Sequence, residues 1–134
     1  MFVCRQKVLF QHCDPAGIVF YPRYFEMINA TVEEWFSDRL DFGFEIMHGK
    51  LGVAVPTAAL QITFTAPSML GDMLDFRLKA TRLGRSSLDL MIEAFCGDEK
   101  RLSMTSTLVF TKRGAGKSEP WPDGLRQKIS DEIN

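Results

Sequence analysis

The spacing of apolar residues changes along this chain, from a helical period near the N-terminus to strict alternation in the middle. Between residues 22 and 40, apolar side chains recur every three or four positions, which predicts an amphipathic helix. Pro22 suits the first turn of this helix, where a missing N–H costs nothing. The predicted apolar stripe consists of Phe25, Ile28, Val32, Trp35, Phe36 and Leu40. A helix with so wide an apolar stripe must be covered by another layer of structure.

Five segments alternate apolar and polar residues with a period of two, which predicts five β-strands. The predicted strands span residues 2–11, 57–65, 74–80, 88–94 and 101–113. The residues expected on one face of the first strand are Phe2, Cys4, Val8 and Phe10. Short segments rich in Gly, Pro and Ser join the last four strands, which predicts an antiparallel meander. Residues 43–56 and 114–122 are predicted loops, and residues 123–133 a short final helix.

The predicted order is one strand, one long helix and then four antiparallel strands, with no internal repeat and no second domain in residues 1–134. An antiparallel sheet with one apolar face can bury that face against the single apolar helix. This arrangement is a two-layer α+β domain. The edges of such a sheet invite pairing with a second copy of the chain, so we expect a symmetric dimer.

The composition fits a soluble globular domain and argues against several kinds of partner. The chain has 134 residues, of which 46% are hydrophobic and 25% charged, and its net charge is -1. Without a basic excess, a nucleic-acid partner is not expected. No apolar run approaches the ~20 residues of a membrane span, and the first residues do not form a signal peptide. Three widely spaced cysteines predict neither a disulfide framework nor a metal pair, and they fit a cytoplasmic location.

The most informative chemistry lies between the first strand and the helix, where Asp14 is followed by Pro15, Ala16 and Gly17. Pro15 keeps Asp14 out of the helical conformation, and Gly17 loosens the backbone of the turn. The helix that follows starts with unpaired N–H groups at the positive end of its dipole. A carboxylate beside such donors can attack a carbonyl, or activate water against it, while the donors hold the oxyanion. The residues therefore indicate acyl-transfer chemistry at Asp14.

This turn and its neighbours resemble a known family. The run from Cys13 to Tyr24 contains DPAGIV followed by an aromatic residue and the pattern Tyr-Pro-x-Tyr, which is specific. It resembles the 4-hydroxybenzoyl-CoA thioesterase family of hot-dog fold acyl-CoA thioesterases. The element order over residues 2–113 is similar to that fold, in which a five-stranded antiparallel sheet wraps around one long helix.

The resemblance implies hydrolysis of an acyl-CoA thioester to a free acid and CoA. It implies no metal and no separate cofactor, because coenzyme A is part of the substrate. Asp14 would be the nucleophile or the general base, and the backbone N–H of Tyr21 would polarise the thioester carbonyl. The site would lie at a subunit interface of a homodimer or homotetramer. The residues predicted to bind substrate are Gly17, Ile18, Val19, Tyr24, Thr57 and Arg85.

Three of these positions have more than one interpretation. Tyr24 either lines the pocket or packs at the interface, and Thr57 reaches substrate only across a dimer. In the family, a basic triplet in the turn between the third and fourth strands contacts the CoA phosphates. Here Arg85 fits one of those positions, whereas the two residues before it do not. Other branches carry a histidine soon after the motif tyrosine, where this chain has Pro22, which favours an aromatic acyl-CoA as substrate.

Two other functions remain open from the sequence. One is an enoyl-thioester hydratase, which needs a carboxylate paired with a histidine, and here His12 lies two residues before Asp14. The other is a non-catalytic module that binds acyl-CoA or an acyl carrier. A carboxylate that faces an anionic ligand has no use in a binding module, so the aspartate favours an enzyme.

Overall fold

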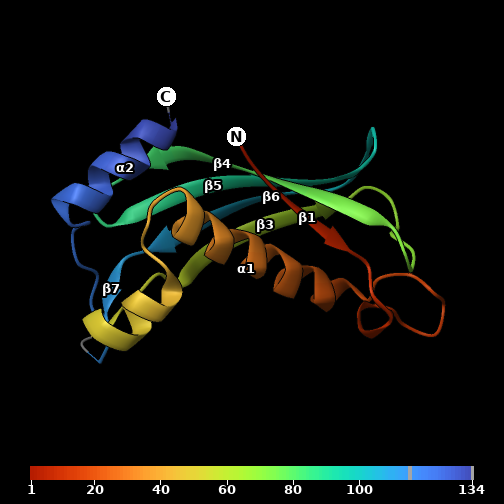
Figure 1. Cartoon of the computed structure of the whole chain (residues 1–134), viewed down its shortest axis with the longest axis horizontal. Coiled ribbons are helices and arrows are strands. Elements are labelled where there is room, and N and C mark those ends of the chain that lie inside the picture. The colour runs from red at the N-terminus through yellow and green to blue at the C-terminus, as the bar shows by residue number, and fades with distance from the viewer. Residues whose placement is uncertain (115, 134) are drawn as a thin grey trace.

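The computed structural model describes residues 1–114 and 116–133, and it places one long helix against one face of an antiparallel sheet (Figure 1). Helix α1 (Tyr21–Asp38) begins one residue before its predicted start and ends two residues before its predicted end. The large sheet has five strands, as predicted. They are β1 (Phe2–Lys7), β3 (Thr57–Phe64), β4 (Met73–Leu83), β5 (Ser87–Cys96) and β6 (Glu99–Val109).

One face of α1 is buried against the sheet, and the helical periodicity predicted this face. The buried residues of α1 are Tyr24, Met27, Ile28, Thr31, Val32, Trp35 and Phe36. Alternate residues of β4, β5 and β6 are also buried, so the helix and the sheet share one core. Phe25 is the exception on the predicted stripe, because it is only half-buried and lines a hollow at the surface.

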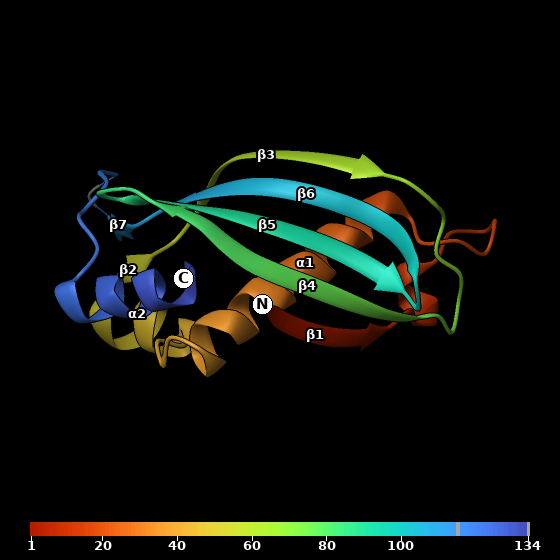
Figure 2. The ribbon, with the colours of Figure 1, turned by 90° about the horizontal axis from the view of Figure 1, so that it is seen from above.

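The strands follow the order β1-β4-β5-β6-β3 across the sheet. The predicted meander is confirmed for β4, β5 and β6, which pair consecutively and antiparallel, but it is wrong for β3. β3 pairs with β6 and not with β4. The connection from β3 to β4, residues 65–72, crosses the end of the sheet (Figure 2). Crossing three strand spacings takes about 14 Å, and eight residues can span up to about 26 Å. We call residues 65–72 the crossover loop.

The first strand is shorter than predicted, since β1 has six residues and Phe10–His12 forms a 3-10 turn. Val8 is fully buried, but Phe10 is 83% exposed, so its predicted place on the core face is wrong. Just after the strand, the Val8 backbone pairs with the crossover loop. Its N–H donates to the Asp72 carbonyl at 2.8 Å, and its carbonyl accepts the Gly71 N–H at 2.9 Å.

The predicted loop at residues 43–56 contains a π-helical turn (Ile46–Leu51) and the short strand β2 (Val53–Ala54). β2 pairs with β7 (Thr111–Lys112), so the last predicted strand is broken into two. The break comes at Phe110, whose buried side chain keeps the alternating pattern of β6 and belongs to the core. This small sheet lies at the end of the molecule away from the segment that carries Asp14 (Figure 1).

Helix α2 (Asp123–Ile133) confirms the predicted final helix and lies at that same end of the molecule. The Trp35 indole N–H donates to the Glu132 carboxylate at 3.2 Å, which joins α1 to α2. Just before α2, the Trp121 indole N–H donates to the Ser87 carbonyl at 3.1 Å. In the part of the chain that the structure describes, no helix is long and apolar enough to cross a membrane.

Candidate active site

Asp14 lies in a short loop, residues 13–20, in which the chain folds back on itself before α1 begins; we call it the Asp14 loop. Its two arms pair through an antiparallel bridge between Cys13 and Val19. The Asp14 N–H donates to the Ile18 carbonyl at 3.0 Å, and the Gly17 N–H donates to the Asp14 carbonyl at 2.9 Å. Gly17 has a φ of 82°, a left-handed conformation that residues with a side chain rarely adopt. The turn therefore requires this glycine.

Asp14 is half-buried, and among the described residues only one of its two carboxylate oxygens accepts a hydrogen bond. Oδ1 accepts the Ala16 N–H at 2.9 Å, which fixes the side chain in a local turn. Oδ2 has no hydrogen-bond partner among the residues that the structure describes. The carboxylate is therefore oriented by the loop and keeps one oxygen available, as a nucleophile or a general base requires.

The start of α1 supplies a hydrogen-bond donor close to this carboxylate in the chain. Tyr21 is the first helical residue, and Phe20 before it is extended and provides no side-chain cap. Pro22 has no N–H, and the Arg23 N–H donates to the Phe20 carbonyl at 2.8 Å. The first N–H groups of a helix have no acceptor within the helix. The Tyr21 N–H is therefore a free donor, within the described chain, at the positive end of the helix dipole.

The Asp14 loop and α1 border a hollow of about 390 Å³ that reaches β3 and the crossover loop. Its walls include Ile18, Val19, Tyr21, Tyr24, Phe64 and Pro67. The buried Tyr24 ring stacks on the Phe64 ring with centroids 5.4 Å apart. The Tyr21 ring is 58% exposed and meets Phe64 edge-on at 6.3 Å. The hollow therefore presents aromatic faces and edges next to the start of α1.

Six of the eight predicted site residues lie together at this end of the molecule, and two lie at the other end. The six are Asp14, Gly17, Ile18, Val19, Tyr21 and Tyr24. Thr57 begins β3 and Arg85 lies in the turn between β4 and β5, both at the far end of the sheet (Figure 2). Thr57 lines a second hollow of about 390 Å³, between α1 and β3, together with Asn29, His48 and mostly apolar residues. Within one chain, neither residue reaches a substrate held at Asp14.

His12 has a structural role, and its side chain is not hydrogen-bonded to Asp14. Its side chain is buried, and its Nδ1 accepts the Leu9 N–H at 2.8 Å. Its carbonyl accepts the Phe20 N–H at 2.9 Å, which closes the Asp14 loop at its base. Among the described residues, no three His, Cys, Asp or Glu side chains lie close enough together to hold a metal ion.

The part of the wall that comes from Phe64 and the crossover loop is not marked by any pattern in the sequence. Ile18 forms an antiparallel bridge with Met69, and the Val19 N–H donates to the Ser68 carbonyl at 2.8 Å. The crossover loop thus adds a third extended segment beside the two arms of the Asp14 loop. Alternation marks Phe64 only as an apolar strand residue. Its contact with the hollow follows from the position of β3 at the edge of the sheet.

Comparisons with known proteins found one matching family model and several solved structures with the same fold. Residues 8–129 match a family model described as the thioesterase-like superfamily. A thioesterase superfamily protein from Jannaschia sp. CCS1 has a TM-score of 0.91 at 26% identity, over 99% of this chain and 93% of that one. A 1,4-dihydroxy-2-naphthoyl-CoA thioesterase from Synechocystis has a TM-score of 0.88 at 21% identity, over 99% and 98%. A gentisyl-coenzyme A thioesterase has a TM-score of 0.87 at 23% identity, over 96% and 99%. No curated protein matches the chain.

Proposed function

Because the chain belongs to the thioesterase-like superfamily, we propose that it hydrolyses an acyl-CoA thioester, with Asp14 as nucleophile or general base. The chain has the hot-dog fold, with a five-stranded antiparallel sheet around one long helix. The site proposed for the chemistry is the end of this fold at which the Asp14 loop meets the start of α1.

The observation that carries this proposal is the Asp14 carboxylate, which keeps Oδ2 without a hydrogen bond among the described residues, in the loop that leads directly into the uncapped start of α1. A thioester carbonyl that accepts a hydrogen bond from the Tyr21 N–H becomes more electrophilic at its carbon. If Asp14 attacks, Oδ2 bonds to that carbon, the C–S bond breaks and CoA leaves as a thiolate; water then cleaves the mixed anhydride. If Asp14 is the base, it takes a proton from the water that attacks the same carbon. Both routes give a free acid and CoA.

An aromatic acyl group suits the hollow beside the Asp14 loop. The rings of Tyr21, Tyr24 and Phe64 offer the stacked and edge-on contacts that aromatic groups prefer. Two structural neighbours are thioesterases for 1,4-dihydroxy-2-naphthoyl-CoA and gentisyl-CoA, and both of these acyl groups are aromatic. We therefore propose a hydroxylated aromatic acyl-CoA as the substrate class.

The proposed activity is tested by measuring thiol release from a panel of aromatic, short-chain and long-chain acyl-CoAs. We expect turnover, with kcat/KM for a hydroxybenzoyl-type CoA at least tenfold above that for any aliphatic acyl-CoA. Faster turnover of an aliphatic acyl-CoA would contradict the aromatic class. Absence of turnover on every CoA thioester, and on the matching N-acetylcysteamine thioesters, would contradict hydrolysis itself.

We further propose that two copies of the chain pair along the β3 edges of their sheets. β3 is an edge strand with no charged residue, and its Leu60 and Phe64 are 46% and 42% exposed. The opposite edge, β1, carries Arg5 and Lys7 on its exposed side, which discourages strand pairing. A two-fold axis between antiparallel edges places the start of one β3 beside the end of the other. Thr57 of the partner subunit would then lie near the hollow lined by Tyr21.

Charges on the β3 edge are expected to separate the subunits. The double variant Ala59→Lys/Gln61→Lys sets like charges against each other across the proposed pairing. Light scattering should give a molecular mass of two or four times 15.2 kDa for the wild type and of 15.2 kDa for the variant. The variant should also lose its thioesterase activity. The control is Val3→Lys on the exposed side of β1, which should leave the mass unchanged. A monomeric wild type, or a double variant of unchanged mass, would argue against this interface.

A further inference from the structure

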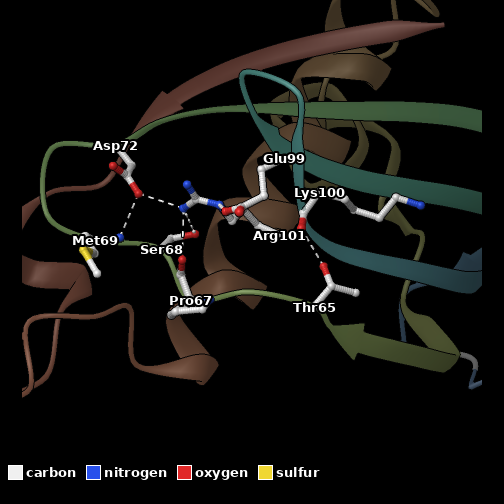
Figure 3. A network of polar contacts seen from close by, with 8 residues as sticks. All are labelled: Thr65, Pro67, Ser68, Met69, Asp72, Glu99, Lys100 and Arg101. Atoms are coloured by element: carbon white, nitrogen blue, oxygen red, sulfur yellow. Dashed lines mark hydrogen bonds and ion pairs between the residues drawn. The ribbon is translucent and has the colours of Figure 1, made fainter.

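One nearly buried arginine holds the crossover loop beside the Asp14 loop (Figure 3). Arg101 lies near the start of β6, and its side chain is 12% exposed. Its Nη1 donates to the Pro67 carbonyl at 3.0 Å, to the Ser68 hydroxyl at 3.2 Å and to Asp72 Oδ2 at 2.7 Å. A single guanidinium nitrogen therefore connects three residues that span most of the crossover loop.

Two carboxylates surround this guanidinium and keep it in place. Asp72 Oδ2 also accepts the Met69 N–H at 2.9 Å, and this bond together with Arg101 lowers the pKa of the Asp72 carboxyl. Glu99 Oε1 lies 2.6 Å from Arg101 Nε as an ion pair, although the angle does not make a hydrogen bond. The Arg101–Asp72 pair is therefore charged at neutral pH. Because both partners are mostly shielded from water, it holds the loop more firmly than an exposed pair would.

Backbone contacts connect this cluster to the Asp14 loop. The Ser68 carbonyl accepts the Val19 N–H at 2.8 Å, and Met69 forms the bridge with Ile18. Ser68 is fully buried, with its hydroxyl bound by Arg101 and its carbonyl by Val19. Val19 comes two residues before Tyr21, whose N–H is proposed to hold the thioester carbonyl. A displacement of Ser68 would therefore be transmitted over a very short path to the start of α1.

The middle of the crossover loop depends on the Arg101 side chain more than its ends do. At the first end, the Thr65 N–H donates to the Arg101 carbonyl at 2.9 Å, and the Thr65 hydroxyl donates to the Lys100 carbonyl at 2.7 Å. At the other end, the Val8 N–H donates to the Asp72 carbonyl at 2.8 Å. Between these ends, Pro67 and Ser68 accept hydrogen bonds from the Arg101 guanidinium, and no other described residue of β6 bonds to them.

We propose that Arg101 is a positioning residue for thioester hydrolysis. By fixing Ser68 directly and Met69 through Asp72, it holds Val19 and Ile18, and through them the Tyr21 N–H. This inference rests on the proposed function, because its kinetic consequence requires turnover of a thioester. Arg101 is not one of the residues that line the hollow, so its effect is indirect. Removing its guanidinium should lower kcat by misplacing the donor, with little change in KM.

The kinetic test replaces Arg101 by methionine, which keeps most of the side-chain volume but removes all the donors. We expect kcat to fall about 100-fold, as a misplacement of about 1 Å can cause, with KM within threefold of the wild type. Arg101→Lys should recover part of the loss, because an ammonium group can donate to three acceptors. The matched control is Lys100→Met, since Lys100 pairs with Glu93 on β5 at 2.7 Å and its side chain does not bind the crossover loop. This control should keep the wild-type kcat.

Amide hydrogen exchange measured by NMR gives a second result that does not require turnover. In Arg101→Met, exchange at Val19 should rise at least tenfold, while exchange at the central strand residue Ile92 stays unchanged. Unchanged kcat and unchanged Val19 exchange in a folded variant would overturn the proposal. Faster exchange throughout the sheet would also overturn it, because Arg101 would then be a general stabilising residue. If the wild type hydrolyses no thioester, the proposed function fails, and the Val19 result alone decides whether Arg101 holds the loop.

Discussion

Replacing Asp14 by asparagine is expected to lower kcat for thioester hydrolysis by about 10²–10⁴-fold. The asparagine Oδ1 can still accept the Ala16 N–H, so the Asp14 loop should keep its shape. The amide nitrogen that replaces Oδ2 can neither attack the carbonyl carbon nor take a proton from water. Thiol release gives kcat, and thermal unfolding followed by circular dichroism should show a Tm close to that of the wild type.

The matched control for this variant is Asp98→Asn, which makes the same chemical change in the exposed turn between β5 and β6. It should leave kcat unchanged. Full activity of Asp14→Asn would show that Asp14 has no role in catalysis. A different residue would then be the general base. A single turnover of the wild type in ¹⁸O-labelled water tests the nucleophilic route. If water opens the mixed anhydride at the Asp14 carboxyl carbon, the label enters Asp14, which general-base catalysis cannot produce.

The helix and the strands of this fold were predictable because their signals are local. The spacing of apolar residues from Phe25 to Leu40 depends only on which face of α1 meets the sheet. The motif around Asp14 was predictable for the same reason, since Pro15 and Gly17 determine the turn through their own backbone preferences. These features require no knowledge of which strands lie side by side.

The strand order and the support of the site depend on long-range pairing, and the sequence pattern does not contain it. Pro67 and Gly71 mark a change of direction equally well in a hairpin and in a crossover. Arg101 lies on the polar side of β6 with Ser103 and Thr105, so alternation alone predicts that it is solvated. Its burial arises because the crossover loop passes beside it, and that follows from the pairing of β3 with β6.

Replacing Tyr21 by proline is expected to lower kcat by about 10²–10³-fold, which is the usual effect of removing one oxyanion donor. Proline fits the first position of a helix, and Phe20 already has the extended backbone (ψ 123°) that a following proline requires. The helix start should therefore persist while its N–H at residue 21 is lost. Thiol release gives kcat and KM, and an unchanged Tm confirms that α1 still forms.

The proline variant also loses the phenol ring, which is 58% exposed and contacts Phe64. Tyr21→Ala is the control for that loss, because alanine lacks the ring but keeps the backbone N–H. We expect Tyr21→Ala to raise KM, since a wall of the hollow is missing, with kcat within threefold of the wild type. The ratio of kcat between the two variants then measures the hydrogen bond from the N–H, which corresponds to about 3–4 kcal/mol of transition-state stabilisation. Equal kcat values in the two variants would show that the carbonyl is polarised by some other group.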